Sequence, residues 1–154
     1  MSAVAGASTD RGQAPPATTG RAVLLATLDV PFAREAIEFA IESALEARSP
    51  LLVVDAVPLR VGYPASGRSR TAGDVQVREQ QELVVREALE RGAEARSLYF
   101  NHPRPLTALV NVAAERDVGL IVFGPDRAIY GRFRFRRAAR RLRSQAGRLV
   151  WPFD

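Results

Sequence analysis

The chain has 154 residues with 22 basic and 17 acidic side chains, and its formal net charge is +5. This length fits one domain that buries about two-thirds of its extended surface, so the core needs neither disulfides nor a metal. Cysteine is absent, which excludes disulfide bonds, thiolate metal sites and a cysteine nucleophile. No apolar run is long enough for a membrane span, and residues 1–20 lack the features of a secretory signal, so we expect a cytoplasmic protein.

The basic charge is concentrated near the C-terminus. All 22 basic residues are arginines, and nine of them lie between Arg127 and Arg148. Only Asp126 and Asp154 among the 17 carboxylates follow residue 118. The rest of the chain has 13 arginines and 15 carboxylates, so the positive net charge is a local feature of the C-terminal quarter.

Residues 1–20 are mostly Ala, Gly, Ser, Thr and Pro and show no apolar periodicity. Such a segment buries too little apolar surface to offset the entropy of ordering its backbone. We therefore expect a disordered tail at residues 1–20 and one domain at residues 21–154.

A βαβ unit is predicted at the start of this domain. Residues 22–28 are a continuous apolar run that ends at Asp29, which is the pattern of a strand covered by helices on both faces. Apolar residues then recur at helical spacing from Pro31 to Arg48, and residues 51–57 repeat the strand pattern. The crossover between two such strands is right-handed in nearly all proteins.

The middle of the chain continues this alternation. Residues 59–73 lack periodicity and follow the second strand, so they are expected to form a mobile loop over any site. A helix is predicted at residues 74–92 with Asp74 as its cap. A weaker edge strand is expected at residues 97–100, and a further helix at residues 106–116.

The C-terminal quarter begins with a short apolar run at residues 119–123, which predicts a central strand. Gly124 at its carboxyl end allows a positive φ and the close approach of a ligand. An arginine-rich helix follows, and residues 148–151 predict a last strand that Pro152 ends. Because strands and helices alternate five times, we predict a doubly wound α/β fold with a parallel sheet and helices on both faces. The apolar stripe of the last helix consists of Phe135, Ala138, Ala139, Leu142 and Ala146.

Three residues have the chemistry of a site but also simpler interpretations. Asp29 is either a ribose ligand or an ordinary cap or turn residue, and the two are equally supported. Asp55 fits a hydrogen-bonded structural carboxylate better than an ionisable site residue, and His102 fits a loop histidine better than a general base. The sequence contains no nucleophile elbow, metal-ligand cluster or P-loop, so we expect no catalytic activity.

The segments LLATLDVPFAREAIEFA, VVDAVP and DVGLIVFG, in this order and spacing, resemble the universal stress protein family. The resemblance covers about residues 20–154. It implies a Rossmann-like, five-stranded parallel sheet of order 3-2-1-4-5, a role in the stress response and a homodimer formed through the last strand.

The branch of this family that binds ATP has a glycine motif for the phosphates: Gly, two residues, Gly, nine residues, then Gly and Ser or Thr. The resemblance implies that Asp29 would contact the adenosine end and that Gly124 is the first glycine. Arg127 stands at the second glycine. Counting onward places Arg137-Ala138 at the final pair, and a two-residue deletion places Phe135-Arg136 there, so neither alignment recovers the motif.

Glycines in such a motif let backbone N–H groups approach phosphate oxygens closely. Because large side chains should block that approach, we interpret the chain as a non-catalytic binding and signalling module with an altered nucleotide site and no tight ATP binding. The alternative is that the Arg127 guanidinium forms a forked contact with phosphate. Asp29, Gly124 and Arg127 would then bind ATP, AMP or a cyclic nucleotide.

Arginines four residues apart occur repeatedly from Arg132 to Arg143, and each such pair opposes helix formation by ~0.3 kcal/mol. A solvated surface face is the simplest interpretation. Otherwise a phosphate-bearing ligand, a nucleic acid, an anionic membrane surface or an acidic partner subunit compensates the charge. A second alternative function is therefore anion or nucleic-acid binding, but Tyr130 and Phe133 are a weak stacking platform, so we expect a protein partner or homodimer instead.

Overall fold

A computed structural model describes residues 21–59 and 72–153 of the chain. The expected tail at residues 1–20 and most of the expected loop at residues 59–73 lie outside the described residues. The domain boundary at residue 21 therefore stays a prediction.

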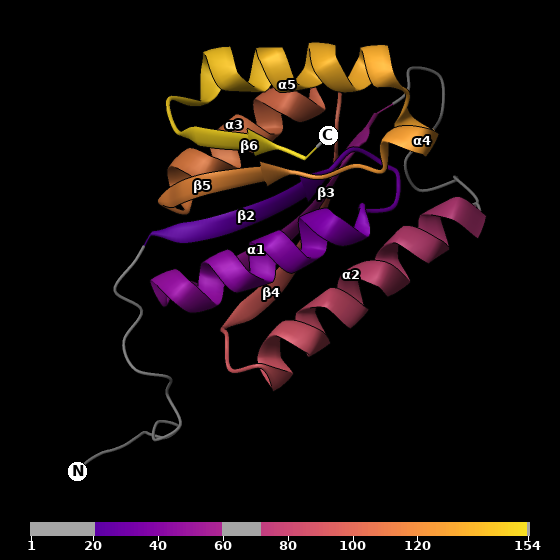
Figure 1. Ribbon diagram of the computed structural model, residues 1–154. Coiled ribbons are helices and arrows are strands. Elements are labelled where there is room, and N and C mark those ends of the chain that lie inside the picture. Colours follow the sequence, from indigo (N-terminus) through magenta and orange to yellow (C-terminus); the bar gives the residue numbers. More distant parts are fainter. Residues whose placement is uncertain (1–20, 60–71, 154) are drawn as a thin grey trace.

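Five strands form one parallel sheet in the order β4-β3-β2-β5-β6 (Figure 1). Numbered along the chain, this is the order 3-2-1-4-5 that the family resemblance implies, so that prediction is confirmed. The weaker strand lies at one edge, as expected, and the last strand lies at the other. The strands are β2 (Ala22–Thr27), β3 (Leu51–Pro58), β4 (Ala95–His102), β5 (Val118–Phe123) and β6 (Leu149–Pro152).

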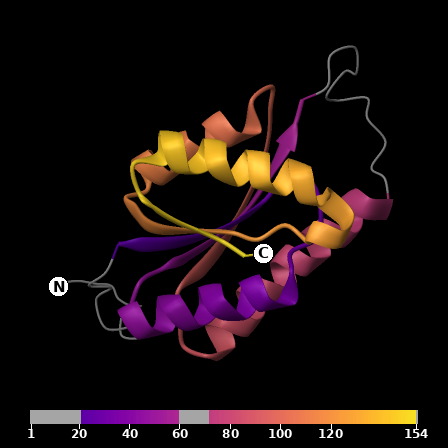
Figure 2. The ribbon, with the colours of Figure 1, turned by 45° about the horizontal axis from the view of Figure 1, so that its top comes forward.

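Helices cover both faces of the sheet. α1 and α2 lie on one face, and α3 and α5 lie on the other, which Figure 2 shows from a second direction. The predicted doubly wound α/β fold is thus confirmed. The helices are α1 (Arg34–Ala47), α2 (Ala72–Glu90), α3 (Pro105–Glu115), α4 (Arg127–Tyr130) and α5 (Arg132–Ala146).

The side chains of the central strand β2 are covered by helices on both faces of the sheet. Leu24 and Ala26 of β2 pack in the hydrophobic cluster under α3 and α5, whereas Val23 and Leu25 pack in the cluster under α1 and α2. Successive side chains of a strand point to opposite faces, so a strand covered on both sides is mostly apolar along its length.

The first helix starts later than the sequence predicts, at Arg34 instead of Pro31. Phe32 forms an isolated antiparallel bridge with Pro125 of the loop after β5. The Gln80 side chain of α2 also holds Phe32, accepting a hydrogen bond from its N–H at 2.7 Å and donating one to its carbonyl at 3.2 Å. Tertiary contacts therefore hold these residues in an extended conformation.

Two other boundaries differ from the prediction. α2 begins at Ala72, so Asp74 lies inside the helix and is not its cap. α4 is a short helix that the sequence does not predict, because four residues are too few to show periodicity. Pro152 is the last residue of β6, where an edge strand tolerates a residue without an N–H.

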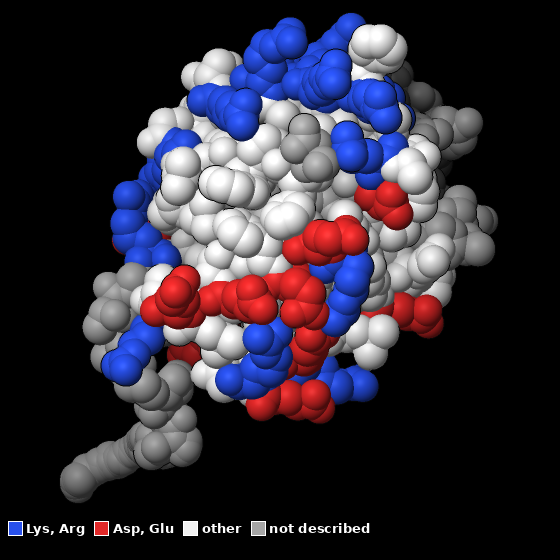
Figure 3. All heavy atoms as spheres, viewed as in Figure 1, with Lys and Arg blue, Asp and Glu red and all other residues white. Residues whose placement is uncertain are grey.

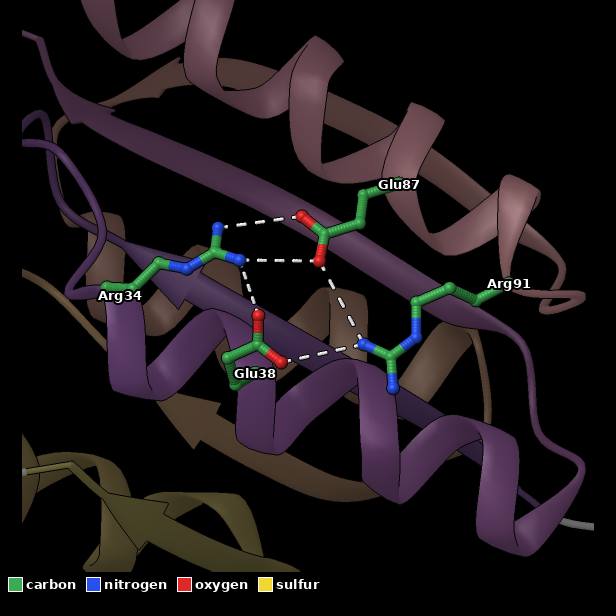
Figure 4. A network of polar contacts seen from close by, with 4 residues as sticks. All are labelled: Arg34, Glu38, Glu87 and Arg91. Atoms are coloured by element: carbon green, nitrogen blue, oxygen red, sulfur yellow. Dashed lines mark hydrogen bonds and ion pairs between the residues drawn. The ribbon is translucent and has the colours of Figure 1, made fainter.

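Four charged side chains tie α1 to α2 (Figure 4). Glu87 accepts from Arg34 at 3.4 and 3.5 Å and lies 3.9 Å from the Arg91 guanidinium. Glu38 contacts Arg34 on its own helix and Arg91 at 3.5 Å. Each carboxylate therefore bridges both arginines, and the network links the exposed sides of the two helices.

Candidate functional site

The chain runs outward from β2 through β3 to β4 and then returns to β5 on the other side of β2. In parallel α/β sheets, ligands bind in the crevice that this reversal leaves at the carboxyl ends of the two central strands. Asp29 follows the end of β2, and Gly124 follows the end of β5. The two strands are paired up to Ala26 and Phe123, so the structure brings both predicted site residues to the same edge of the sheet.

Asp29 lies in a tight turn. Its backbone φ is 63°, in the left-handed region, and its N–H donates to Oδ1 of Asp55 at 2.8 Å. The Thr27 hydroxyl closes the same turn by donating to the carbonyl of Val30 at 2.6 Å. Asp29 does not cap α1, because Ala33 is the N-cap residue; it stands in the turn after β2, and its role as a ribose ligand stays a prediction.

Asp55 is the one carboxylate of β3, and it is buried, with only 1% of its surface exposed. Its hydrogen bond from the Asp29 N–H agrees with the interpretation as a structural, hydrogen-bonded carboxylate. Such a bond offsets part of the cost of burying the carboxylate. Asp55 therefore positions the turn that carries Asp29.

Gly124 has a packing role. Gly124 does not use the positive φ that a glycine allows: the glycines with positive φ in the described residues are Gly92, Gly131 and Gly147. A Cβ at residue 124 would lie 2.5 Å from Cβ of Ala36 in α1 and 3.3 Å from Cδ1 of Leu25. A side chain is therefore excluded by the close approach of β5 to α1.

Backbone hydrogen bonds join the two loops that border the crevice. Ala33 N–H donates to the carbonyl of Gly124 at 2.9 Å, and Asp126 N–H donates to the carbonyl of Pro31 at 2.8 Å. The Gly124 N–H donates to the carbonyl of Ala26 at 2.9 Å. The N–H groups of Gly124 and Asp126 are thus already paired, and neither is available to an anion.

Arg127, the third predicted site residue, is half-buried and is the first residue of α4. The residue before it, Asp126, caps α4: its Oδ1 accepts from the Ala128 N–H at 2.9 Å. An acidic side chain therefore occupies the Ala128 N–H at the start of α4. Arg127 and Asp126 place opposite charges side by side at the point where the family motif has a glycine.

The two residue pairs that the alternative alignments place at the end of the glycine motif can be located in the structure. Arg137-Ala138 and Phe135-Arg136 both lie inside α5, so neither pair stands at the start of the helix. The residue at that place is Gly131, the N-cap of α5, with a φ of 99°. Sequence reasoning missed Gly131, although a glycine directly before an amphipathic stripe was a usable signal.

Tyr130 anchors the short helix α4 in the core below α5. Burial raises the pKa of its hydroxyl above the ordinary value of 10.0, and the positive charge and hydrogen bond of Arg134 partly oppose this. The Arg134 guanidinium lies 4.3 Å from the centre of the Tyr130 ring. Tyr130 thereby holds α4 and the start of α5 together.

The arginines of α5 form one exposed basic face. Figure 3 shows them as a blue band, while red carboxylates gather over α1 and α2. Among residues 21–59 and 72–153, no carboxylate lies within 4.0 Å of any α5 guanidinium. The predicted apolar stripe of this helix is confirmed as buried at Phe135, Ala138, Ala139, Leu142 and Ala146.

No group of three or more His, Asp or Glu side chains that could hold a metal occurs in the described part of the chain. His102 lies at the end of β4, where its Nδ1 accepts from the Arg104 N–H at 2.9 Å. His102 therefore belongs to the strand and not to the loop that the sequence predicts for it. None of the described helices is long and apolar enough to cross a membrane.

Solved structures with the same fold support the topology. A universal stress protein from Archaeoglobus fulgidus in complex with dAMP is 22% identical and has a TM-score of 0.63, with 88% of this chain and 98% of that chain covered. A family member from Burkholderia pseudomallei is 19% identical with a TM-score of 0.64, covering 90% and 98%. An Arabidopsis thaliana family protein with AMP bound is 13% identical with a TM-score of 0.59, covering 87% and 91%.

No curated protein matches the sequence. The model of the universal stress protein family matches residues 20–148, which is most of the chain. Together with the sheet order and the helices on both faces, this match leads to one conclusion: the chain belongs to the universal stress protein family.

Proposed function

We propose that the chain is a non-catalytic binding and signalling module of the stress response whose crevice does not hold ATP tightly. The observation that carries the proposal is the hydrogen bond from the Ala128 N–H to the carboxylate of Asp126. A phosphate chain in a glycine loop is held by free backbone N–H groups. Here a negative side chain already occupies one of these groups.

Two further features support the same conclusion. The N–H groups of Gly124 and Asp126 are used in backbone hydrogen bonds to Ala26 and Pro31. A triphosphate would also approach the Asp126 carboxylate, and like charges about 4 Å apart repel by several kcal/mol near a protein surface. Arg127 offsets part of this repulsion, but one guanidinium does not replace a ring of amide donors.

The proposed role is binding and not turnover. The sequence offers no nucleophile elbow and no P-loop, and Asp55 is engaged with the turn at Asp29. Binding of a ligand or partner would then act by changing which surface the module presents.

An adenine mononucleotide is the second candidate ligand. The similar structures from Archaeoglobus fulgidus and Arabidopsis thaliana contain dAMP and AMP, which each carry one phosphate. A single phosphate needs fewer donors than a triphosphate, and the planar guanidinium of Arg127 can supply two of them in a forked contact. Asp29, Gly124 and Arg127 would then form the site.

Calorimetric titration with ATP and with AMP, each with magnesium, separates the two candidates. If the crevice does not hold ATP tightly, the wild-type protein gives no saturable heat with ATP. Saturable binding of AMP that Arg127→Ala weakens would establish the mononucleotide site instead. Arg148→Ala is the matched control, because Arg148 lies between α5 and β6 and hydrogen-bonds the carbonyl groups of Val118 and Ala146.

A further inference from the structure

One side of α5 points away from the sheet. The apolar stripe of this helix packs on the sheet, so the residues half a turn away from the stripe form the opposite, solvent-facing side. Figure 1 shows the helix along an outer boundary of the molecule. The outer face of α5, as we call this side, consists of Phe133, Arg136, Arg137, Arg140 and Arg141, which are all exposed.

The charge of the outer face has no nearby counterpart in the described part of the chain. α5 contains no Asp or Glu. No carboxylate of residues 21–59 or 72–153 lies within 4.0 Å of the guanidinium groups of this face. Arginines four residues apart repel each other on a helix, and Arg137 and Arg141 are such a pair. A partner that carries negative charge would therefore stabilise α5.

An exposed aromatic ring lies beside these arginines. Phe133 is 85% exposed, more than any other large apolar side chain of the described residues, and it stands one helical turn before Arg137. Ile129 of the preceding helix α4 is 58% exposed. Both side chains lie outside the two core clusters, so the core does not require an apolar residue at either position.

The shape and the charge of the molecule give this face one direction. A helix of 15 residues is about 22 Å long, and its exposed side is a ridge that a flat surface can contact along its length. Acidic side chains gather over α1 and α2, on the other face of the sheet (Figure 3). A negatively charged plane would therefore attract one side of the molecule and repel the other, which orients the protein on it.

We infer that the outer face of α5 docks on the surface of an anionic lipid bilayer. The guanidinium groups donate forked hydrogen bonds to the phosphate and carboxylate groups of the lipid headgroups. The apolar stems of the arginines and the Phe133 ring lie against the upper parts of the acyl chains. The apolar stripe of α5 stays buried on the sheet, so the folded protein binds at the bilayer surface without inserting the helix.

Other anionic partners fit this face less well. Binding of single-stranded nucleic acid relies on several rings on which successive bases stack, and Phe133 is the one exposed aromatic residue of α5. Ile129 would have no partner in a sugar–phosphate backbone. A helical peptide binds in a groove, whereas the outer face is the convex side of a helix. A bilayer offers both negative charge and an apolar interior to the same face.

A dimer formed through β6 is compatible with this site. Antiparallel pairing of two β6 strands around a two-fold axis extends one sheet, so both α5 helices lie on the same side of it. One bilayer can then contact the outer faces of both copies. Arg136 and Arg140 line a hollow between α5 and β6, but Arg137 and Arg141 do not, so variants of the latter pair leave that edge unchanged.

Flotation of the full chain with lipid vesicles tests the inference. The probes are vesicles of phosphatidylcholine alone and vesicles in which about 30% of the lipid is phosphatidylserine. At low salt we expect binding to the anionic vesicles to be about tenfold tighter or more, a difference of about 1.4 kcal/mol. This binding should weaken in about 1 M salt, where the screening length is about 3 Å.

Two double variants of equal net charge separate the outer face from attraction to the whole molecule. Arg137→Gln with Arg141→Gln removes an i, i+4 repulsion, so the variant should fold, and its binding to anionic vesicles should fall about tenfold or more. Arg86→Gln with Arg96→Gln is the matched control, because these exposed arginines belong to α2 and β4. The control should retain binding within about threefold, since its charges lie away from the bilayer.

The aromatic ring has a test of its own. Phe133→Ala should weaken vesicle binding about fivefold or more, because the ring no longer contacts the acyl chains. The free energy of unfolding in urea should not fall, because the ring is exposed in the free protein. Leu83→Ala is the control: Leu83 is 58% exposed on α2, so its removal should not change vesicle binding.

Three results would overturn the inference. No binding to anionic vesicles, or equal binding to both kinds of vesicle, would mean that the arginines form a solvated surface. An equal loss in the two double variants would indicate attraction to net charge alone. Tighter binding of a fluorescein-labelled oligonucleotide than of anionic vesicles at the same salt concentration, lost in Arg137→Gln with Arg141→Gln, would assign the outer face to nucleic acid.

Discussion

The Oδ1 atom of Asp126 accepts a hydrogen bond from the N–H of Ala128 at 2.9 Å, at the start of the short helix α4. This pairing lies directly after the strand whose end borders the crevice. An acidic cap there stabilises α4, since Asp is among the best N-cap residues. The same carboxylate opposes a phosphate group at this place, so local stability and triphosphate binding make conflicting demands on residue 126.

Replacing Asp126 separates these two effects. Asp126→Asn keeps a capping oxygen and removes the charge, so we expect a change in unfolding free energy below about 0.5 kcal/mol and a gain in affinity for adenine nucleotides. Asp126→Ala should lose about 1 kcal/mol of stability through the missing cap. Urea unfolding and calorimetric titration measure the two quantities. A loss of nucleotide binding in Asp126→Asn would show instead that the carboxylate is part of a binding site.

Gly124 and Ala36 should be coupled through their close contact. Gly124→Ala places a Cβ 2.5 Å from Cβ of Ala36, and we expect this overpacking to destabilise the fold by about 1–3 kcal/mol. Ala36→Gly alone costs about 1 kcal/mol of helix propensity. In the double variant the Ala36 methyl is absent, which makes room for the Cβ at residue 124. The double variant should therefore lose less stability than the two single variants together. Strict additivity in urea unfolding would argue against the contact.

Because the Tyr130 hydroxyl is buried, we expect the protein to lose stability at alkaline pH. Burial raises the pKa of its hydroxyl above 10.0, so the folded state favours the neutral form. The resulting stabilisation is fully present below pH 10.0 and is lost as the pH rises through the higher folded-state pKa. Tyr130→Phe should therefore show a smaller fall in unfolding free energy across this range. Tyr99→Phe on the edge strand is the control, and an identical pH profile for wild type and Tyr130→Phe would refute the prediction.

The four-residue network between α1 and α2 should contribute little and should respond to salt. Glu87→Gln removes the carboxylate that contacts both Arg34 and Arg91. Because these side chains are partly exposed, we expect a loss below about 1 kcal/mol at low salt. The loss should shrink further in about 1 M salt, where screening acts over about 3 Å. Glu42→Gln, on an exposed part of α1 outside the network, should have no effect in either condition.

The sheet order and the helix layers follow from features that the sequence carries locally. The continuous apolar run at residues 22–28 predicts a strand buried on both faces, and β2 is the central strand of the sheet. The poorer apolar pattern at residues 97–100 predicts an edge strand, and β4 lies at the edge. The stripe of α5 is buried because its spacing matches the helical repeat.

Other features depend on contacts between segments that are far apart in the chain. The role of Gly124 is set by Ala36 in α1, which no local pattern around residue 124 indicates. The late start of α1 is set by Gln80 and Pro125. Gln81 is another example: it is 2% exposed, and its amide donates to the carbonyl groups of Val53 and Leu98. The short helix α4 was not predicted, because no periodicity marks a helix of four residues.

Titration of the purified protein with magnesium and ATP, by calorimetry, tests the proposed function most directly. We predict no saturable heat up to about 1 mM ATP, a concentration that corresponds to a binding free energy of only about −4 kcal/mol. Saturable binding with a dissociation constant of about 10 μM or below, which Arg127→Ala abolishes and Arg148→Ala preserves, would contradict the proposal. That result would mean that the crevice holds a triphosphate through a side chain in place of the glycine loop.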